Sequence, residues 1–290
     1  MTMNKLIPRL VLFTTCFFCF TAVKAQYYYK DIVSHAQNLE KFSRLRKSKV
    51  ASVQVTSYEA NGEASEGFLF NQQLNSGYTQ AKTIMEVPFS GRMSLTNFYN
   101  GSGQLYRTWD SGYQTFTVYE YGYDSLQRLV SILQAVQAIG DKTKTTENHY
   151  WIYNAKGFPE KMIRVKGLSD SSIIRLETDE QGRVLEEYPL VNGKAGDKTY
   201  YYYDSLGRMT DIVRFNDKAG KLIPDYMFDY YDNGSLRQMV TLEPGTLAQG
   251  TWIYLYDEKG LTTEEKFYNA QKKLAGRMAY QYQFPMGTPA

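Results

Sequence analysis

One short turn motif recurs along this chain: a tyrosine, then an aspartate or asparagine, then a glycine three residues later. The clearest copies are Tyr123-Asp124-Ser-Leu-Gln-Arg128, Tyr203-Asp204-Ser-Leu-Gly207-Arg208 and Tyr256-Asp257-Glu-Lys-Gly260-Leu261, with Tyr153-Asn154-Ala-Lys-Gly157-Phe158 as a fourth. The copies follow one another at intervals of roughly 25 residues, a period that marks a repeat architecture. Each unit has room for two strands and two turns.

The chemistry of the motif is that of a tight hairpin. The side chain of Asp124 or Asn154 can accept a backbone N–H bond from two residues further on. A glycine such as Gly157 then supplies the left-handed residue that closes a turn with a bulge. Gln127 and Lys272 stand at this glycine position in two copies, where we expect strain because non-glycine residues avoid positive φ. The turn explains Asp and Gly without any ligand.

Residues 1–25 have the pattern of a signal peptide. Lys5 and Arg9 precede an apolar run over 10–20, which is too short to span a membrane as a helix. Val23-Lys24-Ala25 supplies a cleavage site before Gln26. A retained anchor is the less favoured alternative. The chain is therefore expected in the periplasm, on the outer-membrane surface or outside the cell, with no transmembrane span after cleavage.

Cleavage changes the charge balance of the protein. Three of its 33 basic side chains and none of its 30 acidic ones lie in the signal peptide, so the mature chain is neutral. A neutral chain with mixed signs has no electrostatic footprint for nucleic acid. Both cysteines, Cys16 and Cys19, are also removed. The fold must therefore be stabilised by packing and not by disulfides.

The segment 26–48 differs from the rest of the chain. Ile32, Ala36, Leu39 and Phe42 recur at helical spacing, and basic residues gather at the end of the segment, where they suit the helix dipole. We predict a short amphipathic helix that is capped by Asp31 and lies on the first strands. A disordered linker is the alternative.

From Lys49 onward the hydrophobic period is two, which predicts one β-repeat domain over 49–290. Many strands of similar length are separated by three to six turn residues. No further helix is predicted, which excludes a parallel α/β sheet. The expected fold is all-β: an antiparallel meander of repeated hairpins that forms a curved or coiled open sheet, with one short N-terminal helix.

The motif resembles the YD repeat, also called the RHS repeat, whose hallmark is Tyr-x-Tyr-Asp-x-x-Gly-Arg. The matching segments are Tyr121-Gly-Tyr123-Asp124, Tyr201-Tyr-Tyr203-Asp204-Ser-Leu-Gly207-Arg208 and Tyr254-Leu-Tyr256-Asp257-Glu-Lys-Gly260, within roughly residues 95–284. The resemblance implies an antiparallel sheet that coils. In large members this sheet forms a shell around a toxin or part of a cell-surface ectodomain, sometimes linked to carbohydrate binding. This chain is far shorter, so an open sheet is expected.

The aromatic residues two positions before each motif tyrosine are the candidate binding residues. Such rings share one strand face and could stack on sugars or anchor a peptide. The alternative is that they form the core of the sheet, since aromatic ladders stabilise sheets through cross-strand pairs. With one further ring on the last of these strands, the set is Tyr121, Trp151, Tyr201, Trp252 and Tyr254.

Catalysis has little support in the sequence. The mature chain has two histidines, His35 and His149, and no nucleophile or cofactor motif. The doublets Glu186-Glu187 and Glu264-Glu265 place their carboxylates on opposite faces of a strand. A hydrolase that uses carboxylates across strands stays open as an alternative. No catalytic residue or cofactor is predicted. Each Asp-x-x-Gly turn offers too few oxygens for calcium, so no metal is predicted either.

An outer-membrane barrel is disfavoured because charges fall on both faces of predicted strands. Glu264 and Lys266 share one face and Glu265 takes the other, whereas a lipid-facing wall is free of charge. The leading hypothesis is an exported, non-enzymatic β-repeat protein of the cell envelope or surface, with a glycan or protein partner. The alternatives are a polysaccharide hydrolase and a purely architectural component.

Overall fold

The computed structural model describes residues 27–88, 91–242 and 247–285. The predicted signal peptide lies outside them. The elements are α1 (Lys30–Lys47), β1 (Ser52–Glu59), β2 (Leu69–Leu74), β3 (Gln80–Val87), β4 (Gly91–Tyr99), β5 (Leu105–Ser111), β6 (Thr115–Tyr123), β7 (Leu129–Ala138), β8 (Lys144–Tyr153), β9 (Pro159–Lys166), β10 (Asp170–Thr178), β11 (Val184–Val191), β12 (Lys194–Ala195), β13 (Thr199–Tyr203), β14 (Met209–Asn216), β15 (Lys221–Tyr230), β16 (Leu236–Leu242), β17 (Gln249–Tyr256), β18 (Thr262–Tyr268) and β19 (Leu274–Gln283).

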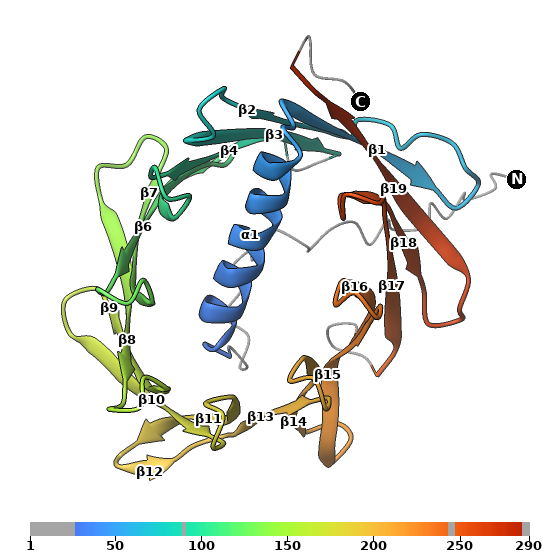
Figure 1. Ribbon diagram of the computed structural model, residues 1–290. Helices are drawn as coiled ribbons and strands as arrows, with labels where there is room; N and C mark the ends of the chain where they lie inside the picture. The colour runs from blue at the N-terminus through green and yellow to red at the C-terminus, as the bar shows by residue number, and fades with distance from the viewer. Residues whose placement is uncertain (1–26, 89–90, 243–246, 286–290) are drawn as a thin grey trace, which may run out of the picture.

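The strands form a closed antiparallel barrel (Figure 1). Each strand pairs with the next along the chain, and the last strand, β19, pairs with the first, β1, from Ser52 opposite Gln283 to Glu59 opposite Gly276. The two-residue β12 pairs with β11 only, and β11 continues the wall by pairing with β13. Eighteen of the 19 described strands therefore make the wall. The expectation of an open sheet was wrong.

Curvature accumulates at the turn motifs. The strand register shifts beside the motif tyrosine in successive copies, for example at Tyr123, Tyr203 and Tyr256. A bulge bends its strand and increases the local twist. A bulge that recurs in every unit turns the sheet in the same sense each time, so the sheet meets its own first strand.

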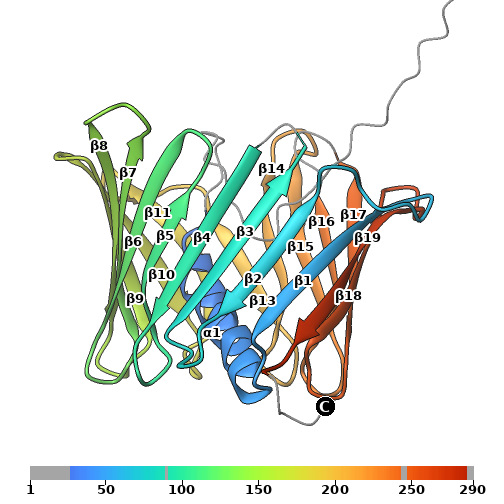
Figure 2. The ribbon, with the colours of Figure 1, turned by 90° about the horizontal axis from the view of Figure 1, so that it is seen from above.

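The meander gives the barrel two different ends. The turns opened by Asn100, Asp124, Asn154, Asp179, Asp204 and Asp257 follow strands that all run in the same direction, so these turns lie at one end, called here the motif end. The chain also finishes β19 there (Figure 2). The hairpins β1–β2, β3–β4, β5–β6, β7–β8, β9–β10, β11–β13, β14–β15, β16–β17 and β18–β19 lie at the opposite end, called here the far end. The copy of the motif at Asn269 lies at this far end.

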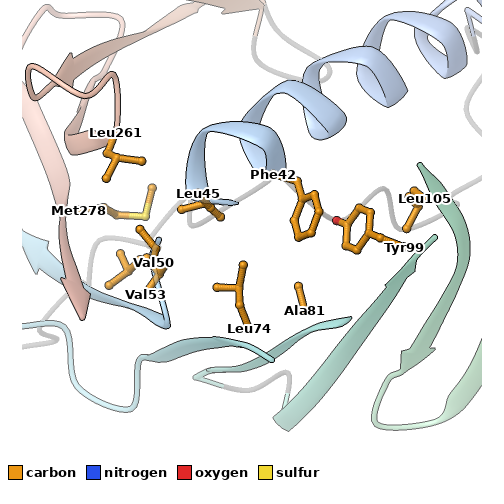
Figure 3. Close-up of a cluster of buried hydrophobic side chains, with 11 residues drawn as sticks. Phe42, Leu45, Val50, Val53, Leu74, Ala81, Tyr99, Leu105, Leu261 and Met278 are labelled. Carbon is orange, nitrogen blue, oxygen red and sulfur yellow. The ribbon is translucent and has the colours of Figure 1, made fainter. Parts of the chain in front are cut away.

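The helix α1 lies inside the barrel (Figures 1 and 2). Its C-terminal half joins the closure cluster (Figure 3), in which Phe42 stacks on Tyr99 with ring centroids 3.5 Å apart. The buried members of this cluster are Phe42, Leu45, Val50, Val53, Val55, Leu74, Ala81, Tyr99, Leu105, Leu261 and Met278. They come from α1 and the segment that follows it, from the first five strands, from the turn before β18 and from β19, so this cluster packs against the seam where β1 meets β19.

The N-terminal end of the helix packs against the other side of the wall. Tyr27, Tyr28, Tyr29 and Ile32 contact a second cluster of buried residues, consisting of Trp151, Met162, Ile174, Leu176, Val184, Tyr201 and Ile212. The helix was predicted from its periodicity and was expected to lie on the first strands. Its C-terminal end packs there, but its N-terminal end packs against the other side of the wall. Asp31 does not cap the helix, because its carboxylate binds His149 on β8.

Tyrosine hydroxyls tie neighbouring motif turns together. Each donates a hydrogen bond to the backbone carbonyl at the start of the preceding strand, as Tyr203 does to Val184 at 2.8 Å. We call this set the tyrosine ladder. Its bonds run from Tyr123 to Leu105, Tyr153 to Leu129, Tyr203 to Val184, Tyr230 to Met209, Tyr256 to Leu236 and Tyr282 to Thr262.

The arginine of the motif adds a second tie. Arg208 forms an ion pair with Asp204 within its own turn and donates to the Tyr231 carbonyl of the next turn. Its guanidinium also lies 4.9 Å from the centre of the Tyr230 ring. Asp therefore acts in turn geometry, as the turn chemistry predicted, and Arg links neighbouring units, a role that was not predicted.

The backbone at the glycine position agrees with the sequence. Gly157 has φ +83°, and Gln127 and Lys272 adopt φ 65° and 58°. These two turns keep the left-handed conformation without glycine, so the strain expected there is present.

Replacing Tyr203 by Phe removes one bond of the ladder and leaves the Val184 carbonyl without that donor. We expect the free energy of unfolding to fall by about 1 kcal/mol, measured by denaturant titration. Tyr202→Phe is the matched control, because that half-exposed ring lies on the outer side of the same strand. An equal loss in both variants would contradict the role of the ladder.

Candidate functional site

The predicted aromatic row faces the interior of the barrel. Trp151 and Tyr201 are only 3% and 2% exposed, and Tyr254 is also buried. Tyr121 stacks on His35 at 5.1 Å, and Trp252 packs on Phe267 at 4.8 Å. The row is therefore not an exposed platform. Closure of the sheet turned the face that carries these rings inward, where the helix and the residues before it pack against several of them.

A cluster of charged side chains anchors the start of α1 to the wall. The Asp31 carboxylate lies 2.6 Å from Nδ1 of His149, and Glu147 lies 3.1 Å from Nε2 of the same ring. Arg164 on β9 pairs with Glu147 at 2.8 Å. Two acids and two bases are thus brought together from the helix and two neighbouring strands. Their charges balance when His149 is protonated.

The surroundings favour the protonated form of His149. Burial alone would lower its pKa, but the hydrogen bonds and negative charges of Asp31 and Glu147 outweigh that effect and raise the pKa to about 9. The hydrogen bond from His149 and the pairing with Arg164 hold the pKa of Glu147 low, at about 2. His149 is therefore a cation at neutral pH and acts as an ion-pair partner of the helix.

Glu187 on β11 holds the same end of the helix. It accepts the backbone N–H groups of Tyr28 and Tyr29 at 2.5 and 2.7 Å, and the hydroxyl of Tyr201 at 3.1 Å. Burial raises the pKa of this carboxyl to about 7, although the three donors oppose that rise. A carboxylate at this place satisfies backbone donors ahead of the first helical turn and complements the helix dipole.

This interior site has the character of a structural clamp. A general base needs a free lone pair facing a substrate, whereas both nitrogens of His149 face carboxylates and both oxygens of Glu187 accept hydrogen bonds. Glu186 and Glu264 face outward, where they pair with Lys198 and Lys266, while Glu187 and Glu265 face inward. The predicted splitting of both glutamate doublets is confirmed.

The clamp partners were missed by the sequence reasoning. Asp31 and His149 are 118 residues apart, and Tyr28 and Glu187 are 159 residues apart. Only the closed topology brings them together. His149 was interpreted as a surface or packing residue. Glu147 lies two residues before it on the same strand face, which the period of two could have indicated, whereas Asp31 had no signal in the sequence.

The exposed aromatics lie on the outer wall instead. Phe98 on β4 packs against Trp109 and Tyr106 on β5, with ring centroids 4.7 and 6.3 Å apart. Phe116 on β6 is exposed beside them, opposite Ser111 in the register, and Trp109 is 42% exposed. We call these four rings the outer aromatic patch. An ion pair between Arg107 and Glu120, 2.7 Å long, lies on the same face.

Two open hollows are found at the ends of the barrel. One, of about 420 Å³, lies at the motif end between the turns 154–158 and 178–180. The other, of about 380 Å³, lies at the far end beside Lys144, Lys166 and Asp170. Neither gathers the buried polar groups of the clamp.

Within the residues that the structure describes, no three or more His, Cys, Asp or Glu side chains form a group suited to a metal ion. The same residues include no helix that is long and apolar enough to cross a membrane.

No protein-family model matches this chain, and no curated protein matches it in sequence. Among solved structures, the chain is similar to part of a chain in the crystal structure of TcdB2-TccC3-Cdc42, with 13% identity and a TM-score of 0.34 over 74% of this chain and 12% of that chain. It is also similar to porin-like proteins from Bacteroides uniformis (9% identity, TM-score 0.38, 81% of this chain and 98% of that one) and Bacteroides vulgatus (11%, 0.30, 82% and 99%).

This chain thus spans about 12% of the length of the toxin chain that it matches. All three TM-scores are low, so these likenesses assign neither a family nor an activity. The resemblance to the YD repeat rests on the motif residues.

The clamp predicts a loss of stability at alkaline pH. His149 has a pKa near 6.5 when unfolded and about 9 when folded, so its contribution is complete below pH 6.5 and is lost as the pH rises through 9. We expect the free energy of unfolding to fall by about 2–3 kcal/mol over this range. His149→Gln should abolish most of that slope. His35→Gln is the control and should keep it, because burial lowers the pKa of His35 to about 4. A slope that survives in His149→Gln would exclude His149 as its source.

Proposed function

We propose that the mature chain is an exported β-barrel whose outer wall faces water and whose interior holds its own helix. We propose further that it serves as a non-enzymatic binding module of the cell envelope or surface. The predicted signal peptide supports export. The polarity of the barrel wall is the observation that carries the proposal.

The inside of the wall carries the two apolar clusters together with the charged side chains of the clamp, whereas the outside carries recurring ion pairs. Fully buried side chains such as Met162, Ile174 and Val184 face the helix. On the outside, Glu264 pairs with Lys266 at 2.9 Å and with Arg277 at 3.0 Å, in the middle of neighbouring strands. Outward ion pairs recur around the wall between Arg107 and Glu120, Lys198 and Glu186, and Arg237 and Asp229.

A membrane-spanning barrel has an uncharged outer band, and the ion pairs on the outside of this wall interrupt such a band. Charged side chains on a lipid-facing wall cost several kcal/mol near the bilayer midplane. The helix and its two clusters also occupy the interior that a pore would need. These features support a water-facing barrel over a channel.

The outer aromatic patch is the surface that we assign to binding. Exposed apolar patches on soluble proteins mark interaction sites, and Trp and Tyr are the residues that most often anchor a partner. Flat rings can stack on the apolar face of a sugar ring, and the adjacent Arg107 and Glu120 offer a donor and an acceptor for its hydroxyls. A glycan is therefore the proposed partner class, as the YD-repeat resemblance also suggests.

A polysaccharide hydrolase is less well supported. Glycosidases need two carboxyl groups that flank an accessible bond. Among the described interior acids, Asp31, Glu147 and Glu187 are engaged in the clamp, and the buried Glu265 accepts a hydrogen bond from the Tyr280 hydroxyl. A protein partner on the same patch is the other outcome that the binding experiment can reveal.

The wall polarity predicts how the secreted chain behaves in solution. We expect it to be folded and monodisperse in detergent-free buffer, measured by size-exclusion chromatography with light scattering. We also expect no channel conductance in planar bilayers. Aggregation without detergent, together with discrete conductance steps, would contradict a water-facing barrel.

Binding at the outer aromatic patch is tested with Trp109→Ala. On a glycan array, the wild-type chain should bind at least one class of glycan, and the variant should lose that binding by about tenfold or more, as for truncation of an aromatic hot spot. Tyr202→Ala is the control, because Tyr202 is an exposed ring elsewhere on the outer wall.

Absence of binding to every glycan would remove the carbohydrate assignment. Equal losses in Trp109→Ala and Tyr202→Ala would place the binding site away from the patch. Unfolding curves of both variants confirm that they remain folded.

A further inference from the structure

A row of exposed apolar side chains lies along the far end of the barrel. Six successive hairpins there each present at least one such residue. These are Tyr113 in β5–β6, Ile139 in β7–β8, Leu168 in β9–β10, Val191 in β11–β13, Phe215 and Leu222 in β14–β15, and Leu247 in β16–β17. We call them the apolar rim.

Packing within the chain does not account for the rim. Leu168 is 105% exposed and Tyr113 is 71% exposed, and both lie in turns that polar residues would suit better. At the motif end only Leu126 and Leu206 are comparably exposed in their turns, and the other motif turns present polar residues such as Lys156, Gln181 and Lys259. The two ends of one barrel therefore differ in the surface that they offer.

The rim is also positively charged, although the mature chain is neutral. The far-end segments 138–144, 166–170, 191–199 and 215–222 hold seven lysines and four aspartates, with no other charged residue. The motif-end segments 123–129, 153–159, 178–184 and 203–209 hold four acidic and four basic residues. The positive charge thus belongs to the sector of the far end that carries Ile139, Leu168, Val191, Phe215 and Leu222, whereas the β1–β2 hairpin at the same end carries Glu59, Glu63 and Glu66.

The spacing of the rim residues indicates which kind of partner can bind them. Neighbouring hairpins of a meander are two strands apart, about 10 Å at the usual strand spacing. Single apolar side chains at such intervals along a curved edge do not form a groove for one protein segment. Each of them can, however, enter the interface of a bilayer separately. Apolar residues flanked by lysines are the combination that binds anionic lipid surfaces, and each lysine near such a surface contributes about 1 kcal/mol.

We propose that the far end of the barrel docks on an anionic lipid bilayer, with the apolar rim inserted among the headgroups and the lysines at the level of the lipid phosphates. The barrel binds to the membrane surface and does not cross the bilayer. Lysine stems cover apolar surface while their ammonium groups reach the phosphates. The outer aromatic patch lies on the side wall, so both surfaces can act at once.

Vesicle co-sedimentation of the secreted chain tests this proposal. The chain should bind vesicles of phosphatidylethanolamine and phosphatidylglycerol at least tenfold more tightly than vesicles of phosphatidylcholine, and added salt should weaken binding. The variant Ile139→Ser/Leu168→Ser/Phe215→Ser should lose tenfold or more. The control Leu126→Ser/Leu206→Ser, with two equally exposed residues at the motif end, should bind as the wild type does.

All five positions are exposed, so the variants should keep the unfolding midpoint of the wild type, which circular dichroism checks. Failure of the wild type to sediment with anionic vesicles would overturn the proposal. Equal losses in the rim variant and the control would also overturn it. Oligomers that depend on the rim and form without lipid would instead identify a second copy of the chain as the occupant.

Discussion

The whole barrel depends on the packing of one helix against the inside of its wall. A sheet that curls into a wide ring has an inner face that must be covered, and α1 with its two clusters covers much of that face. At one end of the helix, apolar side chains pack on the seam between β1 and β19. At the other end, Glu187 accepts a hydrogen bond from the backbone ahead of the helix, and His149 pairs with Asp31 in its first turn. With the interior occupied in this way, the outer face is free to carry ion pairs and meet water.

The turn chemistry was predictable because it is local. Asp204 and Gly207 lie three residues apart, and their roles follow from backbone geometry alone. The same holds for the conformation of Gln127 and for the opposite faces of Glu186 and Glu187. Closure was not predictable, because it depends on how small bends add up over the whole chain and on a helix that fills the space within. The interior position of Trp151 and Tyr201 follows from closure. The prediction that these rings could form an exposed binding surface therefore depended on the same unpredicted step.

The charges on both strand faces were read correctly, and the wrong architecture came from another argument: an open sheet was expected because the chain is much shorter than the large YD-repeat proteins. Lys266 and Glu264 do face outward and Glu265 does face inward, and these charges exclude an uncharged lipid-facing band. They do not exclude a barrel, since a barrel in water needs no such band. The residues that we propose for binding a partner and a lipid surface lie outside the motif. Trp109 and Leu168 fall between motif copies, and only the fold shows that both are exposed.

The seam between β1 and β19 sets the order in which the structure can be completed. Ser52 bonds to Gln283 across 231 residues of sequence. Each hairpin in the wall can form as soon as both of its strands are available, because its contacts are local. The ring cannot close until the last strand arrives, and until then β1 has an unpaired edge and the inner clusters are incomplete. A chain of many rapidly formed local units therefore ends its folding in one slow, long-range step.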